Sequence, residues 1–423
     1  MIKKSFKRLR LTALAAMAAV CFTAVAENGI LSPYSRIGYG IMRDNATSAQ
    51  KGLGGTGYAM NSGRQINVMN PASYAAIDSL TFLFDMGIDL TAVWQTENQN
   101  GTRLTDNNFG GGLDYITMQF PLGKYMGGSV GLLPYSSVGY AFGSDIENGY
   151  VSRAGSGSIN ELYLGIAGRP FRGFTVGANV AYLFGTTYKD TYAGSDNAGT
   201  ILFERQLEVR DYKLEFGAQY SFNVDPLNRF TLGLVYAPKK DLHGHAETYS
   251  YKYDASNPSP ELTDRSKLKG NYSLAESWGA GINWQWGSRW MVEADFTYQP
   301  WSNAKFDGDG LEEELTRMAN RYRGGIGIQF MPAQRGPYYK VIRYRLGAFY
   351  DRDYQTVQAN NVREYGITAG FGLPVPSFKT VINLAFEWRH RQAYPARLIS
   401  ENYLNISIGV NFNEMWFRQN KLR

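Results

Sequence analysis

The stretch YLNISIGVNF, residues 403–412, indicates the fold class of this chain. Its apolar side chains alternate one by one with polar or small ones. One face carries Leu404, Ile406, Ile408, Val410 and Phe412, and the other carries Asn405, Ser407, Gly409 and Asn411. A period of two is that of a β-strand whose two faces meet different surroundings. The stretch therefore predicts a strand with one apolar face and one polar or small face.

The same alternation recurs along the chain and predicts about fourteen strands, an even number. They are expected near 80–94, 111–120, 126–142, 157–168, 173–186, 206–222, 229–250, 272–286, 289–299, 321–330, 341–351, 363–373, 379–391 and 402–412. Helical periodicity is almost absent. No apolar run after residue 26 approaches 18 residues, which excludes helical membrane spans. Aromatic residues make up 14% of the chain, as expected for a wall that meets a membrane interface.

The connections between these strands alternate in length. Those after odd strands are long and polar, such as QTENQNGTRLTDNN (residues 95–108), whereas those after even strands are mostly short, such as RPFR (residues 169–172). Bacterial outer-membrane barrels show this asymmetry. The sequence thus predicts an all-β transmembrane antiparallel barrel over residues 79–423, in the outer membrane of a Gram-negative bacterium. Membrane lipid and lipopolysaccharide would surround it, and the barrel assembly machinery would be a partner during biogenesis.

The two ends of the chain agree with this prediction. A basic start, the apolar LTALAAMAAV and the small-x-small site Ala24-Val25-Ala26 predict a signal peptide over residues 1–26, cleaved near Ala26. The single cysteine, Cys21, lies inside it; AAVC makes a poor lipidation box because Val20 stands where a small residue is needed. We expect an exported chain without disulfides. Near the other end, Phe412, or Trp416 with Phe417, would be the C-terminal barrel signal.

The net charge carries little information about partners. The formal charge is +6, but five positive charges and no acids lie in residues 1–26, so the remainder is about +1. No basic patch suggests nucleic acid.

Residues 27–78 precede the first strand and are too short for a domain with its own core. Fourteen strands enclose a lumen too wide for wall side chains alone to fill. We therefore expect this segment to fold into the lumen as a plug. Asn70-Pro71-Ala72 would mark its end, because Pro71 fixes φ and favours an extended Asn70.

The stretch KGLGGTGYAMNSGRQINVMNPASYAAID (residues 51–78) resembles the plug end of the FadL-type outer-membrane transporters, the family of TodX-like channels for long-chain fatty acids and other hydrophobic compounds. The resemblance rests on Asn70, Pro71 and Ala72 and on the glycine stretch Gly52, Gly54, Gly55 and Gly57. Residues 118–140 are also similar to that family's second hairpin. The resemblance implies capture of a hydrophobic ligand between outer loops, passage into an apolar pocket, and lateral exit through a gap where the third strand kinks.

The predicted third strand contains Gly127, Gly128, Gly131 and Pro134. Proline lacks the N–H that a ladder needs, and interior glycines mark bulges. These residues would form the lateral opening; the alternative is an ordinary bulge at Pro134 without a gap.

Continuing the alternation inward places charges in the lumen. They are Lys213, Glu215, Glu293, Asp295, Arg323, Arg343, Arg345, Glu387 and Arg389. One of these cations could bind the carboxylate head group of a fatty acid. The simpler role is that the charged side chains pair with one another and with a polar plug.

Other candidate sites are weaker. Asp241, His243 and His245 have a spacing that suits a metal, but they lie near a loop. FDGDGLEEEL (residues 306–315) is acidic without the full EF-hand spacing, and a helix cap is its simpler role. His390 would be the sole wall histidine for an outer-membrane phospholipase. We expect no enzyme activity, no resident metal and no cofactor.

Two functions remain open. The first is a channel for hydrophobic molecules with lateral exit. The second is a non-transporting relative that acts as a scaffold or shuttle subunit of an outer-membrane secretion or assembly complex.

Overall fold

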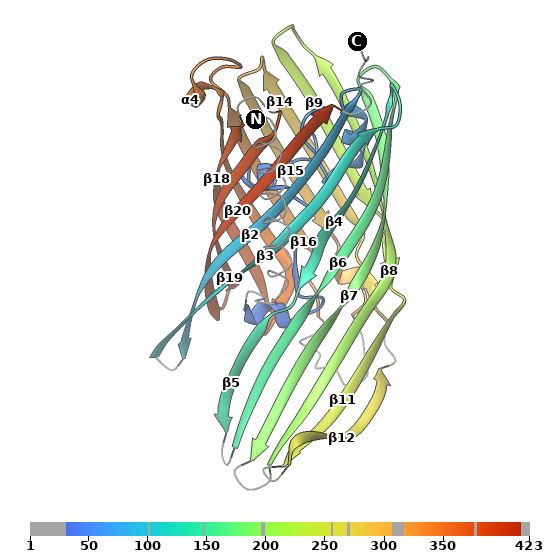
Figure 1. Ribbon diagram of the computed structural model, residues 1–423. Helices are drawn as coiled ribbons and strands as arrows, with labels where there is room; N and C mark the ends of the chain where they lie inside the picture. The colour runs from blue at the N-terminus through green and yellow to red at the C-terminus, as the bar shows by residue number, and fades with distance from the viewer. Residues whose placement is uncertain are drawn as a thin grey trace, which may run out of the picture.

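The computed structural model describes residues 31–415 apart from 100–101, 147–148, 196–198, 255–256, 269–270, 307–316 and 376–378. The chain forms a closed antiparallel barrel of fourteen strands (Figure 1). β2 and β20 close it, with Thr81 opposite Met415 and Glu97 opposite Ile399. The predicted strand number and fold class are confirmed.

Three of the wall strands are built from two pieces. β4 (Met126–Ser137) continues as β5 (Tyr140–Ile146), β9 (Asn228–Ala237) as β11 (Gly244–Asp254), and β12 (Asn257–Leu268) as β14 (Ser277–Trp286). The others are β2 (Thr81–Gln99), β3 (Thr102–Pro121), β6 (Gly149–Phe171), β7 (Phe174–Ser195), β8 (Gly199–Asn223), β15 (Trp290–Gln299), β16 (Arg321–Phe330), β17 (Arg343–Val357), β18 (Asn360–Pro374), β19 (Val381–Tyr394) and β20 (Ile399–Met415).

Short elements lie inside the barrel or at its ends. They are η1 (Pro33–Arg36), β1 (Ile41–Met42), α2 (Ser48–Lys51), η2 (Pro71–Ala76), β10 (Lys240–Asp241), β13 (Ser273–Leu274), η3 (Trp301–Asn303) and α4 (Tyr338–Val341). None of the helices in the described ranges is long and apolar enough to cross a membrane.

The two ends of the barrel differ. At the turn end, uppermost in Figure 1, short connections join neighbouring strands, as between Phe171 and Phe174. At the opposite, loop end, β5 to β8, β11 and β12 project far beyond the rest of the wall. The connections expected to be long loops are therefore largely strand: β2 runs to Gln99 and β3 begins at Thr102. Outside the bilayer both faces of a strand meet water, so no apolar alternation marks it in the sequence.

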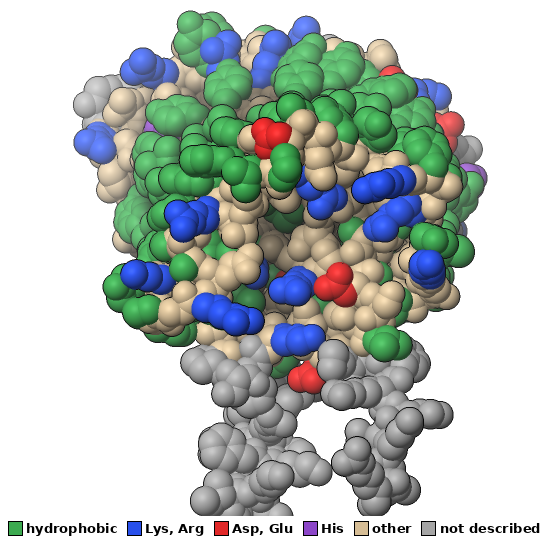
Figure 2. Space-filling view, turned by 90° about the horizontal axis from the view of Figure 1, so that it is seen from above, with side chains coloured by type: hydrophobic (Ala, Val, Ile, Leu, Met, Phe, Trp, Pro, Cys, Tyr) green, Lys and Arg blue, Asp and Glu red, His purple; other side chains and the backbone are tan. Residues whose placement is uncertain are grey.

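The outer wall is apolar across the membrane. On β6, for example, Leu162, Leu164 and Ile166 are exposed while the intervening residues face inward. Exposed aromatic residues lie toward both ends of the wall, as Trp286 and Trp290 do at the turn end. The space-filling view shows apolar side chains around the outside of the turn end (Figure 2). This band is the surface that lipid tails and interfaces require.

The lumen is occupied by the chain's own N-terminal part, residues 31–80, here called the lumen segment. Tyr34, Leu53, Ile66 and Tyr74 in it are each at most 2% exposed. The side chains that bury them come from strands around the whole barrel.

Among the described wall strands, the ladder is interrupted on the β3 side of β4 and between β8 and the seventh strand. β3 and β4 pair only as far as Ile116 opposite Leu132. Beyond that point β4 pairs instead with β1 of the lumen segment, Met42 lying opposite Ser136. The second break separates β8 from the seventh strand: pairing with β9 ends at Phe216 and pairing with β11 resumes at Val209. Here β10 leaves the wall and pairs with β13.

Candidate functional site: the closed, charged lumen

The Asn-Pro-Ala motif begins η2. Asn70 is extended, with φ −141°, and its Oδ1 accepts a hydrogen bond from the Ala72 N–H at 3.0 Å. Its Nδ2 donates to the Tyr58 carbonyl at 2.7 Å. A Cβ on Gly217 of β8 would lie 2.0 Å from the Asn70 Oδ1, so a glycine in the wall admits the motif. The motif thus fastens the end of the lumen segment to an earlier part of that segment and to β8.

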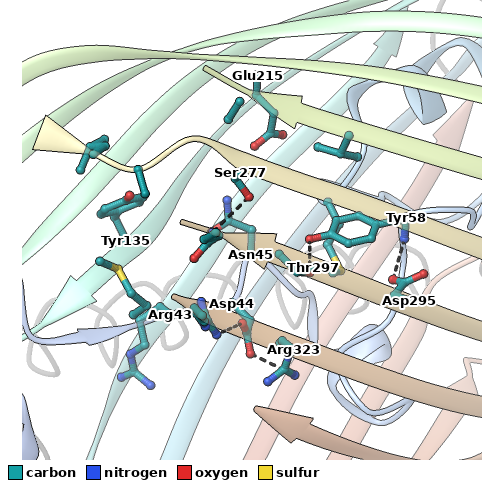
Figure 3. Close-up of a pocket in the computed structure, with 18 of the residues that line it drawn as sticks. Arg43, Asp44, Asn45, Tyr58, Tyr135, Glu215, Ser277, Asp295, Thr297 and Arg323 are labelled. Atoms are coloured by element: carbon teal, nitrogen blue, oxygen red, sulfur yellow. Dashed lines mark hydrogen bonds and ion pairs between the residues drawn. The ribbon is translucent and has the colours of Figure 1, made fainter. Parts of the chain in front are cut away.

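The glycine stretch binds two wall carboxylates through its backbone. Asp295 Oδ2 accepts hydrogen bonds from the N–H groups of Gly57 (2.6 Å) and Tyr58 (2.9 Å), as Figure 3 shows for Tyr58. Glu293 Oε1 accepts one from the Ala59 N–H at 3.0 Å. A Cβ on Gly57 would meet Gln50 Nε2 at 2.2 Å, so a larger residue here would require the buried Gln50 side chain to shift. Buried carboxylates that accept backbone N–H bonds form strong, charge-assisted contacts.

Gly54 and Gly55 shape the same turn. Both have φ near +70°, the left-handed region that favours glycine. A Cβ on Gly54 would lie 2.8 Å from the Ala348 carbonyl, and one on Gly55 2.6 Å from Arg323 Nη2. The backbone here lies directly against β16 and β17.

Asp44 of the lumen segment pairs with two guanidinium groups on β16. Arg321 Nη2 lies 3.3 Å from its Oδ1, and Arg323 Nη2 lies 3.1 Å from its Oδ2 (Figure 3). Burial alone would raise the pKa of Asp44, but the charges of Arg323 and Arg321 outweigh it and lower that pKa. Arg321 also binds Asp351 of β17 at 2.5 Å. The lumen segment and two wall strands therefore share one network of ion pairs, in which Arg321 and Asp351 are buried and Asp44 lines a cavity.

Lys51 makes a similar connection to the first hairpin. Its Nζ pairs with Asp89 of β2 and, at 2.8 Å, with Asp114 of β3. Burial opposes the charge of Lys51, but the two carboxylates raise its pKa. Asp114 lies on the edge of β3 that has no partner in β4. The lumen side of the third-strand break is thus charged.

The remaining lumen charges pair along the wall. Lys213 lies 2.9 Å from Glu161 of β6 and 3.8 Å from Glu215. Arg389 lies 3.6 Å from both Glu387 and Glu364.

Arg343 and Arg345, nearest the turn end, differ from the other seven. Arg345 is 2% exposed and donates to Gln329 (2.8 Å) and Asn383 (2.9 Å). Within the described ranges no carboxylate lies within ion-pair distance of either arginine. The structure thus places all nine predicted charges on the inner face, where Lys213 pairs with Glu215 and Arg389 with Glu387 in separate clusters.

A cavity of about 120 Å³ lies between the lumen segment and the wall. Figure 3 shows part of its lining, with Arg43, Asp44, Asn45, Tyr58 and Glu215 labelled. Charged, amide and hydroxyl groups share this lining with apolar side chains such as Met69, Val235 and Leu274. Toward the loop end an apolar cluster lies among the lumen segment, the wall and the inward-folded β13. This cluster includes Tyr39, Leu183, Leu274, Trp301 and Tyr354. The cavity lining therefore mixes polar and apolar groups, and the apolar cluster is packed in the interior toward the loop end.

The glycines of the third strand lie within a continuous ladder. Gly127, Gly128 and Gly131 pair with β3 on one side and β6 on the other. They do not line the break, which begins beyond Leu132, next to Pro134 and a bulge at Tyr135. Their role is close packing: a Cβ on Gly127 would lie 2.0 Å from the Tyr74 carbonyl.

The other candidates make ordinary contacts. His243, with its side chain 82% exposed, pairs with Asp211 of β8 through its Nδ1 at 3.1 Å. No group of three or more metal-binding side chains occurs among the described residues. His390 bonds Asn402 at 3.0 Å. Residues 307–316, with most of the acidic stretch, lie outside the described residues, as do Trp416 and Phe417. Phe412 packs against Phe84 where β20 meets β2, with ring centroids 5.9 Å apart.

Sequence reasoning missed about half of the lumen network. Five of the missed residues lie on strands whose alternation is visible in the sequence: Glu161, Arg321, Asp351, Glu364 and Arg391. Assigning every second residue of each strand to the lumen face would have identified them. No sequence pattern indicated that Asp44 and Lys51 pair with the wall, because the lumen segment has no regular alternation of apolar and polar residues.

The sequence model of the BamG family matches residues 1–423. No curated protein matches the chain. A FadL homologue from Pseudomonas aeruginosa superposes with a TM-score of 0.64 and 11% identity, covering 89% of this chain and 99% of that one.

Two toluene transporters have the same architecture. TodX from P. putida gives a TM-score of 0.61 at 14% identity over 89% of this chain and 100% of that one. TbuX from Ralstonia pickettii gives 0.54 at 15% identity over 87% and 98%. Identities this low establish the fold alone. The chain therefore belongs to the BamG family and has the fold of the FadL-type outer-membrane barrels.

Proposed function

We propose that this protein is a closed barrel that serves as a structural subunit of an outer-membrane assembly complex. The observation that carries the proposal is the way the lumen segment is held. Ion pairs at Asp44 and Lys51 and backbone bonds to Asp295 fasten it to strands on several sides of the barrel. A cavity of about 120 Å³ lies between this segment and the wall, and Asp44, Lys213, Glu215 and Asp295 are among the residues that line it. Such a lumen suits a rigid scaffold better than a path for an acyl chain.

The family supports the same proposal. BamG carries the prefix given to the barrel assembly machinery, which points to an assembly complex rather than a secretion complex. In this proposal residues 1–26 are a signal peptide, residues 27–78 are a permanent plug, and residues 79–423 form the barrel that partners contact.

The test is purification of a tagged chain in mild detergent from its native outer membrane. We expect it to copurify with the central barrel of the assembly machinery at a fixed stoichiometry, measured by native mass spectrometry. An unrelated outer-membrane barrel with the same tag is the control. Recovery of the monomer alone, under conditions that keep the machinery intact, would reject the proposal.

A second function, uptake of hydrophobic molecules, is favoured by one specific observation. The ladder between β3 and β4 ends at Leu132, beside Pro134, which is where lateral exit would require a gap. Gly127, Gly128 and Gly131 would then position the gap rather than line it. The charged pair Lys51–Asp114 on its lumen side is the main argument against a greasy path.

Uptake of radiolabelled fatty acid and of toluene by whole cells distinguishes the two functions. The subunit proposal expects no change when the chain carries Pro134→Val, and no defect specific to hydrophobic solutes when it is deleted. A selective loss of uptake in both strains, restored by the wild-type chain, would favour the channel.

A further inference from the structure

The turn end of the barrel is strongly basic. Four arginines face its mouth: Arg64 of the lumen segment, Arg169 of β6, Arg229 of β9 and Arg343 of β17. Six more cations stand on the surrounding turns: Lys124, Arg172, Arg289, Arg335, Lys340 and Lys379. Against these, the described part of this end carries the carboxylates of Asp78, Asp225 and Glu414. Figure 2 shows Lys and Arg side chains spread around a hollow at the centre of this face.

The mouth arginines differ from most cations in the middle of the lumen, although Arg345 and Lys189 also donate to neutral acceptors. In the middle of the barrel, Lys51, Lys213, Arg321, Arg323, Arg389 and Arg391 each have a carboxylate within ion-pair distance. At the mouth, Arg169 donates to the Ala75 carbonyl at 3.0 Å and Arg229 to Asn61 at 3.2 Å. These neutral acceptors leave the positive charge uncompensated.

The mouth arginines also lie close to one another. Arg64 and Arg343 come near enough for their charges to interact, and so do Arg169 and Arg229. The one acid beside them, Asp78, lies 3.6 Å from Arg64, in a pair whose side chains are 75% and 58% exposed. Pairs as exposed as this contribute little. Like charges that lie near one another repel, and an anion that joins them from outside relieves this repulsion.

The position of these cations on the barrel indicates which class of anion they would bind. Short turns face the periplasm in barrels of this kind, so the basic face meets periplasmic components. Anionic lipid head groups would reach the cations on the turns, which lie beside the apolar wall. They would not reach the arginines that face the mouth, since these lie inside the ring of strands. An acidic protein segment reaches both sets.

We propose that the turn end is a docking surface for an acidic segment of a periplasmic protein, held at the mouth by Arg64, Arg169, Arg229 and Arg343. The inference rests on the proposed role as a complex subunit and specifies one of its interfaces. The partner is expected to present consecutive Asp or Glu side chains, which match guanidinium groups in bidentate geometry. Electrostatic docking of this kind would be sensitive to salt.

The test uses the full-length protein in nanodiscs of zwitterionic phosphatidylcholine and a fluorescein-labelled deca-glutamate peptide. Fluorescence anisotropy should show saturable binding that weakens as NaCl rises from 50 to about 300 mM. The variant with Arg64, Arg169, Arg229 and Arg343 all changed to Gln should bind at least about tenfold more weakly. The same four positions changed to Lys should retain most of the binding.

A matched control changes four exposed cations at the loop end, Arg103, Lys252, Lys267 and Lys305, to Gln. Equal losses in both Gln variants, or no loss in the mouth variant, would overturn the inference. Nanodiscs containing phosphatidylglycerol distinguish the lipid alternative: binding to anionic lipid that depends on the mouth arginines, without peptide binding, would also overturn it. The heat-dependent gel mobility of each variant verifies folding, and the Lys variant tests the charge if the Gln variant does not fold.

This result is separable from the proposed function. Copurification with the assembly machinery that persists in the mouth variant, without deca-glutamate binding, would reject the docking surface and leave the subunit proposal standing. Peptide binding at the mouth by a chain that is recovered only as a monomer would reject the subunit proposal instead.

Discussion

At the scale of single residues, Asn70 connects the lumen segment to the barrel. Its side chain is fully buried and satisfies two backbone groups, the Ala72 N–H and the Tyr58 carbonyl. Both belong to the lumen segment, and the Asn70 oxygen packs against Gly217 of the wall. A neutral side chain thus fixes the chain direction just before β2 begins.

Replacing Asn70 with Ala should leave the buried Ala72 N–H without its partner, while the Tyr58 carbonyl keeps the hydrogen bond that Gln219 Nε2 donates at 3.0 Å. We expect the free energy of unfolding to fall by about 2 kcal/mol. Urea unfolding in detergent, followed by tryptophan fluorescence, measures it. Asn107→Ala, at an exposed position on β3, is the control and should change stability little. A loss below about 0.5 kcal/mol for Asn70→Ala would mean that water replaces the two bonds.

Alternation placed Glu293, Asp295 and Arg323 on the lumen face, because period two is a local property of a strand. It did not identify their partners, which are backbone N–H groups of Gly57 to Ala59 and the carboxylate of Asp44. Those contacts join residues more than 200 positions apart and depend on how an irregular segment folds inside a closed barrel. Pairings of this kind are not a local property of the sequence.

At the scale of elements, the third strand is where sequence and structure differ most. Glycine and proline together suggested a weakened strand, but their roles are separate. Gly127 and Gly131 admit Tyr74 and Tyr163 against a continuous ladder, whereas the ladder to β3 ends beyond Leu132. Where β4 has no hydrogen bonds to β3, it pairs with β1 of the lumen segment. This strand has only two residues, too few for a hydropathy pattern to predict it.

The pairing of β1 with β4 predicts a specific cross-link. Opposed residues in an antiparallel pair have Cα atoms about 4.5–5.5 Å apart, a distance that a disulfide spans. In a background without Cys21, the variant Met42→Cys with Ser136→Cys should therefore form a disulfide. Thiol counting with a maleimide reagent on the oxidised and reduced protein measures its yield.

The matched control moves the second cysteine along the same strand. Ser129 faces the lumen seven residues away on β4, roughly 20 Å at about 3.3 Å per residue. Met42→Cys with Ser129→Cys should remain reduced. If both pairs cross-linked equally, the lumen segment would be sampling more than one position, and its role as a fixed plug would fail.

At the scale of the whole molecule, the strand number and the closed barrel follow from repetition. Fourteen alternating segments with unequal connections fit few other architectures, so errors at single boundaries did not matter. Even so, the projecting sheet of β5 to β8, β11 and β12 was missed, because strands in water need no apolar face. The state of the lumen was also beyond the sequence, since it depends on the sum of many long-range contacts.

The closed lumen leads to a prediction about conductance. The described lumen segment fills a space that wall side chains cannot fill. Removing residues 31–78 should therefore convert a barrel that does not conduct ions into an open pore. We expect the intact protein to show almost no conductance in planar bilayers, and the shortened protein to show steady, ohmic channels.

Shortening the β11–β12 hairpin instead, by removing residues 251–268, should leave the barrel closed, since this hairpin lies outside the lumen. The substitution Asp44→Asn is a smaller change, which removes the carboxylate that Arg321 and Arg323 share. Brief openings should then appear in the full-length protein, because the two arginines lose one of their partners. An intact protein that conducts as well as the shortened one would show that the lumen segment does not seal the barrel, and the subunit proposal would lose the observation that carries it.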